Sequence, residues 1–107
     1  MRFEIVLAPQ AVQDLRRLPA RIRSEVRDAI EENLRHEPKK TSKSRIKRLR
    51  GITKPQYRLR VGETRVFHDV REQNVEVLAI VAKRQAEQWL TEYGISEPDG
   101  SVGEGER

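Results

Sequence analysis

The stretch "QYRLRVGETRVFHDV", residues 56–70, decides the fold, because its residues alternate in the manner of a β-hairpin. Gly62 and Glu63 separate its two runs, and a two-residue connection that begins with glycine suits a tight turn. Successive side chains of a strand point to opposite faces of a sheet. One face therefore collects the side chains of a core, namely Tyr57, Leu59, Val61, Val66, Val70 and, among them, His68. The other face collects Arg58, Arg60 and Arg65.

The next apolar run, "VEVLAIVA", extends the hairpin into a three-stranded antiparallel meander. The strands are expected at residues 56–61, 64–71 and 74–83. A four-residue connection at 71–74 would place Phe67 opposite Leu78 and, by the same count, Arg65 opposite Ile80. The expected face away from the helices then comprises Arg58, Arg60, Arg65, Phe67, Leu78, Ile80 and, at its far end, Arg84. The face toward the helices receives Val75, Val77, Ala79 and Val81 from the last strand.

The segments around the meander complete an α+β fold. Residues 2–7 alternate as a short strand, and two amphipathic helices follow, from Pro9 to Leu18 and over residues 20–35. Residues 36–55 are expected to form a mostly irregular basic connection that could hide a short strand or helical turn. A short helix is expected at 84–93. The prediction is one mixed sheet packed on a helical hairpin, as a single domain over residues 1–93 with a disordered acidic tail at 94–107.

The charge of the chain is concentrated in one segment. The 107 residues carry a formal net charge of +5 with a sequence pI near 10.0. Residues 38–65 hold eleven of the twenty-two Lys and Arg residues against one acid, Glu63. Such a zone favours a polyanion such as nucleic acid, although a solubilising face is the alternative. No cysteine, long apolar run or secretory signal is present, so we expect a cytoplasmic protein without membrane contact.

The arginine pair in the hairpin needs a physical reason, because like charges directly opposite one another destabilise a sheet. Arg60 and Arg65 face each other across the turn. Either each guanidinium pairs with an acid such as Asp69 or Glu76, or the cluster holds an anionic ligand. Arginine suits phosphate, because its planar fork donates paired hydrogen bonds. Phe67 could stack beneath a base or pack within the protein.

The order of strand, two helices and three strands resembles the RelE/ParE superfamily of bacterial toxins. The residues that carry the resemblance are "YRLRVGETRVF" at 57–67 and "VAKR" at 81–84, with "LRG" at 49–51 and the Pro9 helix start in agreement. The resemblance spans about residues 2–93 and does not separate two branches. One branch cleaves mRNA in the ribosomal A site, and the other inhibits DNA gyrase without cutting.

The resemblance to the RelE branch implies a site and a reaction. Basic residues at the positions of Arg58, Arg60, Arg65 and Arg84 would hold the scissile phosphate and take part in cleavage. The 2′-hydroxyl of the RNA would attack its own phosphate, giving 2′,3′-cyclic phosphate and 5′-hydroxyl ends, with neither metal nor cofactor. Further RNA contacts are expected from Lys47, Arg48, Arg50, Lys54, Phe67 and Lys83, and contacts with ribosomal RNA from the basic segment 39–54.

Three questions stay open from the sequence. A non-catalytic gyrase inhibitor or a basic nucleic-acid-binding domain is the alternative function. His68 has a suitable pKa for a general base but is expected on the helix-covered face. Trp89 and Tyr93 could stack on a base, or Trp89 could anchor the last helix. On either branch the resemblance implies an antitoxin partner whose acidic amphipathic segment would cover the arginine-rimmed apolar floor.

Overall fold

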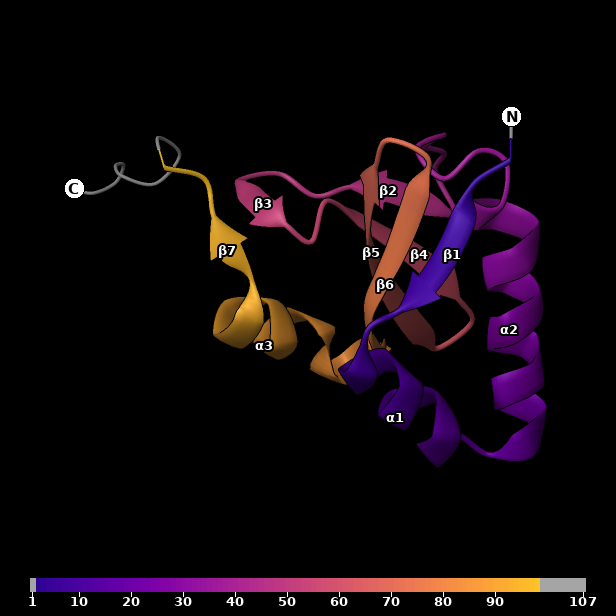
Figure 1. Cartoon of the computed structure of the whole chain (residues 1–107). Coiled ribbons are helices and arrows are strands. Elements are labelled where there is room, and N and C mark those ends of the chain that lie inside the picture. Colours follow the sequence, from indigo (N-terminus) through magenta and orange to yellow (C-terminus); the bar gives the residue numbers. More distant parts are fainter. Residues whose placement is uncertain (1, 99–107) are drawn as a thin grey trace.

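The computed structural model describes residues 2–98 and has the expected α+β architecture, with three helices and a mixed sheet (Figure 1). The helices are α1 Pro9–Arg17, α2 Ala20–Leu34 and α3 Lys83–Tyr93. The strands are β1 Glu4–Leu7, β2 Ile46–Arg48, β3 Ile52–Lys54, β4 Tyr57–Val61, β5 Thr64–Arg71, β6 Asn74–Ala82 and β7 Ile95–Ser96. None of the helices in this part of the chain combines the length and the apolar character that crossing a bilayer requires.

The main sheet has the strand order β1-β6-β5-β4-β2, with β1 parallel to β6 and the other pairs antiparallel. The helices α1 and α2 pack on one side of it (Figure 1). Each contributes its apolar stripe to the core, as the 3.6-residue period predicts. The core comprises Ala11, Leu15, Val26, Ala29, Ile30, Leu34, Ile46, Leu59, Val66, Val75, Val77 and Ile80. The sheet thus has a helix-covered face and an opposite face on which the hairpin arginines lie.

The register of the β4–β5 hairpin is the one that the sequence predicts. Its partners run from Tyr57–His68 to Val61–Thr64, so Arg60 lies directly opposite Arg65. Gly62 adopts a φ of 57°, the left-handed conformation that glycine accepts without steric cost. The two-residue turn and the alternation therefore specify this pairing together.

The register of the β5–β6 pair shifts at a bulge, and the predicted partners beyond it are wrong. Val70 lies opposite Val75 as expected, but the register shifts between His68 and Phe67. Phe67 pairs with Ala79 instead of Leu78, and Arg65 pairs with Val81 instead of Ile80. Because one extra residue reverses the alternation, Ile80 turns into the core and Ala79 and Val81 move to the arginine side.

The side chain of Asp14 supports β6 at this bulge. Strand β1 pairs with β6 only as far as Leu7, and α1 then leaves the sheet. Asp14 Oδ2 on α1 accepts a hydrogen bond of 2.9 Å from the backbone N–H of Ile80. A backbone donor at the edge of a sheet needs such a partner, and here a helix side chain supplies it.

The basic connection at 36–55 is mostly irregular, as expected, and the short strand that it could hide is present as both β2 and β3. Strand β2 pairs with β4 and widens the main sheet, while β3 pairs with β7 in a separate two-stranded sheet. The expected disorder of the tail at 94–107 does not extend to Ile95 and Ser96, which form β7. Residues 99–107 of that tail lie outside the described residues.

Candidate nucleic-acid interface

The face of the sheet that α1 and α2 leave uncovered carries the hairpin arginines, and we call it the arginine face. Paired residues of neighbouring strands share a face, so the register defines its members. They are Lys47 from β2, Arg58 and Arg60 from β4, Arg65 and Phe67 from β5, Ala79 and Val81 from β6 and, beyond the bulge, the paired acids Asp69 and Glu76. The ion pairs in residues 2–98, Arg35–Glu31 and Lys40–Glu37, involve none of these residues. The arginines of this face therefore make no ion pair among the described residues, although Asp69 and Glu76 lie further along the same face.

Arg65 is a buried member of this face, with 6% of its surface exposed. Its Nη1 donates hydrogen bonds to the carbonyl oxygens of Gly62 at 2.8 Å and Thr64 at 3.0 Å. These two bonds tie the Arg65 side chain to the backbone of the hairpin turn. The alternative that the arginines have protein partners thus holds for Arg65, but the partners are backbone carbonyls and not Asp69 or Glu76. Its charge remains on the face while its side chain stabilises the turn.

Arg58 lies half-buried at the centre of the face. Its Nε is buried without a hydrogen-bond partner among the described residues. Burial, followed by the positive charges of Arg65 and Arg60, lowers the pKa of Arg58. A buried donor that lacks a partner costs about 1–3 kcal/mol. An anionic ligand beside this guanidinium would relieve the repulsion among the three guanidinium groups.

The other predicted catalytic residues are exposed. Arg60 is the last residue but one of β4, and Arg84 lies with Lys83 in the first turn of α3. The Lys83 N–H donates to the carbonyl oxygen of Glu63, which ties this helix start to the hairpin turn. The chain therefore brings the exposed cations of α3 to the end of the sheet at which Arg60 and Arg65 pair.

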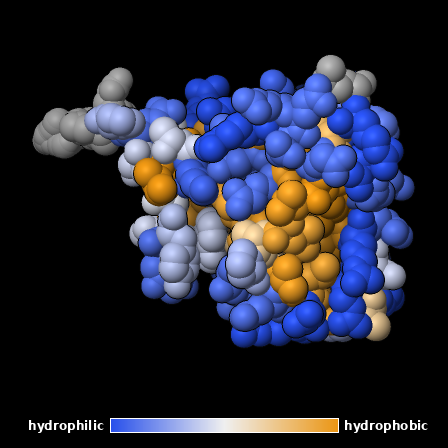
Figure 2. Space-filling view, in the orientation of Figure 1, coloured by the Kyte–Doolittle hydropathy of each residue, from blue (hydrophilic) through white to orange (hydrophobic). Residues whose placement is uncertain are grey.

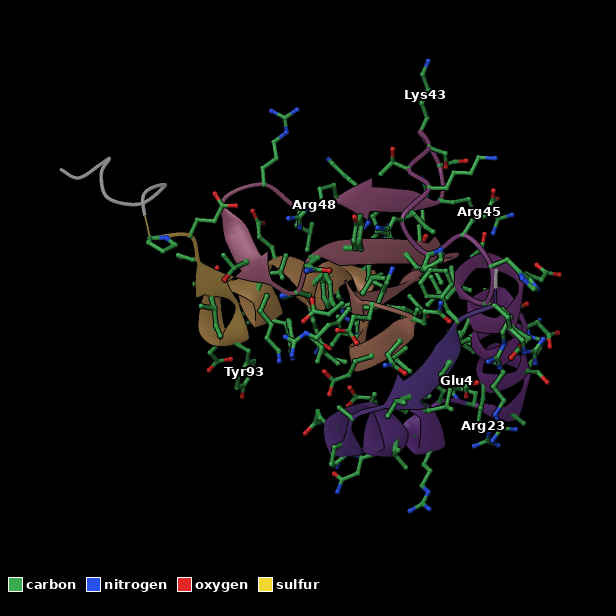
Figure 3. All side chains as sticks on the ribbon, turned by 45° about the horizontal axis from the view of Figure 1, so that its top comes forward. Glu4, Arg23, Lys43, Arg45, Arg48 and Tyr93 are labelled. Carbon is green, nitrogen blue, oxygen red and sulfur yellow. The ribbon has the colours of Figure 1, made fainter. Side chains whose placement is uncertain are left out.

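Phe67 is fully buried, which corrects the expectation that it contacts RNA. Its ring stacks on that of Trp89, with centroids 5.0 Å apart and planes at 11°. Trp89 thus anchors α3 on the sheet, the alternative that the sequence left open. The Tyr93 ring lies 5.5 Å from Trp89 and is 61% exposed (Figure 3). Of these three aromatic residues, Tyr93 presents the largest exposed fraction to a ligand.

A cavity of about 470 Å³ adjoins the stacked rings. It is lined by Gln10, Asp14, Lys54, Pro55, Leu78, Val81, Trp89, Tyr93 and Ile95. Lys54 and Leu78 were predicted near the site, whereas Gln10 and Asp14 were not. Nothing in the local sequence of α1 marks these two residues, because they reach the cavity only through the packing of α1 beside β6.

The remaining predicted RNA contacts fall on different sides of the sheet. Lys47 pairs with Arg58 and extends the arginine face, while the next residue, Arg48, pairs with Tyr57. The Arg48 guanidinium lies 5.3 Å from the Tyr57 ring centroid and donates to the Gln56 carbonyl at 2.8 Å. Figure 3 shows Arg48 beside β2. Arg50 is exposed in the loop between β2 and β3. The alternation of side chains along β2 thus places the neighbouring residues Lys47 and Arg48 on opposite faces of the sheet.

His68 lies on the helix-covered face, as the alternation predicts. It is completely buried, stacks on Tyr57 at 5.4 Å, and its Nε2 lies 3.2 Å from the Pro38 carbonyl oxygen. Burial lowers its pKa from 6.5 to about 4. A neutral imidazole behind the sheet cannot reach a ligand on the arginine face, so His68 is a structural residue.

These features define a small α+β protein with a cluster of arginines on one sheet face, which make no ion pair among the described residues. The family model of the ParE toxin of the type II toxin–antitoxin system parDE matches residues 5–87. The chain belongs to this toxin family, and the predicted membership of the RelE/ParE superfamily is confirmed. A search of curated proteins finds no match.

Solved structures of related toxins share the fold. The RelBE2 toxin–antitoxin complex of Mycobacterium tuberculosis aligns with a TM-score of 0.63 and 23% identity, over 77% of this chain and 99% of that one. The archaeal RelE–RelB complex of Pyrococcus horikoshii aligns at 0.56 with 27% identity, over 78% and 97%. A variant of E. coli RelE in the free state aligns at 0.63 with 18% identity, over 83% and 92%.

Proposed function

We propose that this toxin is a RelE-like mRNA interferase that cleaves mRNA on the ribosome and so inhibits translation and growth. The observation that carries the proposal is the arginine face, where Arg58, with a buried and unpartnered Nε, lies beside Arg60 and Arg65, and none of the three forms an ion pair among the described residues. A phosphodiester is an anion of matching geometry for several guanidinium groups. Arg84 and Lys83 extend the cationic surface at the start of α3.

The proposed reaction uses the nucleophile that RNA already contains. The 2′-hydroxyl oxygen forms a bond to the adjacent phosphorus, and the bond from phosphorus to the 5′-oxygen breaks. The proton of the 2′-hydroxyl passes to solvent water, and the leaving 5′-oxygen takes a proton from solvent. The products are a 2′,3′-cyclic phosphate and a 5′-hydroxyl. Arg58, Arg60 and Arg84 would stabilise the charge that develops on the phosphoryl oxygens, which is commonly the largest catalytic term. Arg65 would act as a positioning residue, because its side chain holds the turn that follows the strand of Arg58 and Arg60.

The proposal includes where the reaction takes place. The basic residues of segment 39–54 would contact ribosomal RNA, and Lys47 is the member of that segment that lies directly beside Arg58. The ribosome would present the message in the A site and bend the backbone toward in-line attack. The protein would act in the cytoplasm together with an antitoxin, and a toxin–antitoxin partnership is supported by the similar RelE proteins that crystallised in complex with RelB.

Mapping of RNA 5′ ends after brief induction tests the proposal. Cells that express the protein should gain 5′-hydroxyl ends within translated messages, and Arg60→Ala and Arg84→Ala should each reduce them by at least about tenfold, because each removes one phosphate contact. Arg71→Ala is the matched control, since Arg71 is an exposed arginine at the opposite end of β5. Unchanged cleavage by both Arg60→Ala and Arg84→Ala would refute the site.

A non-catalytic gyrase inhibitor is the second candidate, and two observations favour it. The matching family model is that of the ParE toxin, and the histidine of the hairpin is buried away from the arginine face. This candidate predicts DNA damage and altered plasmid supercoiling without new 5′-hydroxyl ends. The same induction experiment therefore separates the two functions.

A further inference from the structure

The cavity of about 470 Å³ beside the stacked rings has the size and the lining of a small-molecule site. Residues of α1, β3, β6, α3 and β7 line it. Figure 1 shows α1 and α3 at the same end of β6, and Figure 2 shows apolar surface at β7 beside the weakly polar surface of α3. Sites for small ligands commonly measure about 300–1,000 Å³ and combine an apolar lining with a few polar groups.

The apolar part of this lining suits a flat ligand. Leu78 on β6 and Ile95 on β7 border the cavity together with the aromatic side chains Trp89 and Tyr93. One face of the Trp89 ring is occupied by Phe67, while the Tyr93 ring is tilted by 42° from Trp89 and is mostly exposed. Aromatic side chains that line a cavity provide stacking surface for a planar ring such as a nucleobase.

The carboxylate of Asp14 is the negative group of the cavity, and two hydrogen bonds fix its orientation. Its Oδ1 accepts from Gln10 Nε2 at 2.8 Å, and its Oδ2 accepts from the Ile80 N–H at 2.9 Å. A carboxylate can accept about four hydrogen bonds, so two acceptor positions remain. Asp14 makes no ion pair in the part of the chain that the structure describes. The α1 side of the cavity therefore offers a rigid pair of acceptors.

Lys54 is the positive group of the same cavity, and it comes from a different element, the end of β3. Its side chain is exposed and pairs with no carboxylate within residues 2–98. Asp14 and Lys54 thus do not neutralise each other, although both line the cavity. A complementary ring would present N–H donors on one edge and acceptors on the next edge.

Guanine has this arrangement of polar groups. Its Watson–Crick edge carries the N1–H and the N2 amino group side by side, and its O6 and N7 are acceptors to which lysine commonly donates. Adenine and cytosine would instead turn a ring nitrogen with a lone pair toward the Asp14 carboxylate. Uracil has a single N–H between two carbonyl groups. Two adjacent donors on the edge that meets a carboxylate therefore single out guanine among the four bases of RNA.

We infer that this cavity binds a guanine base, with N1–H and N2–H donating to Asp14, O6 and N7 accepting from Lys54, and the ring stacked on Tyr93. The inference deepens the proposed function and rests on it for the source of the base, a nucleotide of the cleaved message. A free guanine nucleotide has the same base chemistry and is the other source. In either case Asp14 would be a residue that determines base specificity.

Titration with mononucleotides tests the base itself, because Trp89 is the one tryptophan of the chain and lines the cavity. GMP should quench its fluorescence with a dissociation constant of about 1 mM or less. IMP, which lacks the N2 amino group, should bind about fivefold more weakly, and AMP, CMP and UMP at least about tenfold more weakly. Equal binding of all five nucleotides would overturn the inference. So would GMP at about 10 mM that leaves both the fluorescence and the NMR signal of the Trp89 indole N–H unchanged.

Two substitutions test the assigned residues. Asp14→Asn retains an oxygen for the Ile80 N–H but loses the paired acceptors, so GMP affinity should fall at least about tenfold and the preference over AMP should disappear. Asp28→Asn is the matched control, since Asp28 is an exposed aspartate of α2 outside the cavity. An Asp14 that only supported the bulge would leave base preference unchanged, and that result would refute its assignment.

Lys54→Met should weaken GMP at least about fivefold, because the donor to O6 and N7 is lost. Lys43→Met is its control, since Figure 3 shows Lys43 pointing away from the body of the protein. GMP affinity that is the same in the two lysine variants would remove Lys54 from the site.

Mapping of RNA ends in cells distinguishes the two sources of the base and separates this inference from the proposed function. If the message supplies the base, guanine should be enriched at one fixed position beside the new 5′-hydroxyl ends. Asp14→Asn should abolish the enrichment while ends are still produced. Selective GMP binding without the enrichment would assign the cavity to a free guanine nucleotide. Selective GMP binding without any new ends would keep the cavity assignment and refute cleavage, whereas cleavage without selective GMP binding would refute the cavity assignment alone.

Discussion

The two faces of the β4–β5 hairpin have opposite chemistry although they come from the same fifteen residues, 56–70. The helix-covered face buries Leu59, Val66 and His68 completely. The arginine face carries Arg58, Arg60 and Arg65 without a carboxylate partner in the described part of the chain. The difference teaches that stability and function can alternate residue by residue along one strand. Substitutions on the two faces should therefore have separable effects.

The largest loss of stability should come from the helix-covered face. Leu59 is fully buried, so Leu59→Ala should lower the free energy of unfolding by about 2–5 kcal/mol through lost burial and a residual cavity. Arg60→Ala, one residue further on, should change it by less than about 0.5 kcal/mol. Urea denaturation of both variants measures the contrast. Equal losses in the two variants would contradict the division of the faces.

The next largest effect should be a decline of stability in acid that depends on His68. Because burial places the folded pKa of about 4 below the ordinary 6.5, the folded state binds fewer protons than the unfolded state between these values. The contribution of His68 to stability is therefore fully present above pH 6.5 and is lost as the pH decreases toward 4. His68→Phe should flatten this part of the profile in pH-dependent thermal melts. His36→Gln, the control, should retain the decline.

A smaller loss of stability should follow from removal of Arg65, which belongs to the arginine face but is buried. Arg65→Ala removes two hydrogen bonds to the turn and should cost about 1–3 kcal/mol in the free energy of unfolding. Arg65→Ala would then lower the stability of the protein, unlike Arg60→Ala, while both variants would lose RNA cleavage. Denaturation and 5′-end mapping on the same variants measure both properties. A fully stable Arg65→Ala protein would show that the turn needs no side-chain bonds.

The smallest effect concerns two neighbours in β2. Lys47 lies on the arginine face and Arg48 on the other, beside Tyr57. Lys47→Ala should weaken binding of a short RNA by about 0.5–1 kcal/mol and reduce its salt dependence, because one phosphate contact is lost. Arg48→Ala should leave RNA affinity within error. Anisotropy titrations at two salt concentrations measure both, and an equal loss for the two variants would show that charge acts without regard to the face.

The parts of the fold that the sequence predicts correctly are those with local signals. The α2 stripe and the register of β4 with β5 follow from periodicity and from the Gly62-Glu63 turn. The bulge in β6 was not predictable, because its supporting contact comes from Asp14, 66 residues before Ile80. Strands β3 and β7 also pair between segments distant in the sequence, since Thr53 and Ile95 lie 42 residues apart.

The candidate site divides in the same way. The alternation placed Arg58, Arg60 and Arg65 on one face, and the structure has them there. It could not show that Arg65 bonds to its own turn or that Trp89 covers Phe67, because burial depends on where α3 packs. The groove between β1, α1 and α2 was also missed, since its lining comes from three separate elements.

The sequence by itself determined which residues of "QYRLRVGETRVFHDV" share a face, because the two-residue period of a strand and a tight turn are local properties. Only the tertiary structure decided which arginines remain open to a ligand and which are enclosed. It also decided that Ile80 belongs to the core and that β1 keeps an open edge. The physical reason is that burial and strand pairing depend on segments distant in the chain.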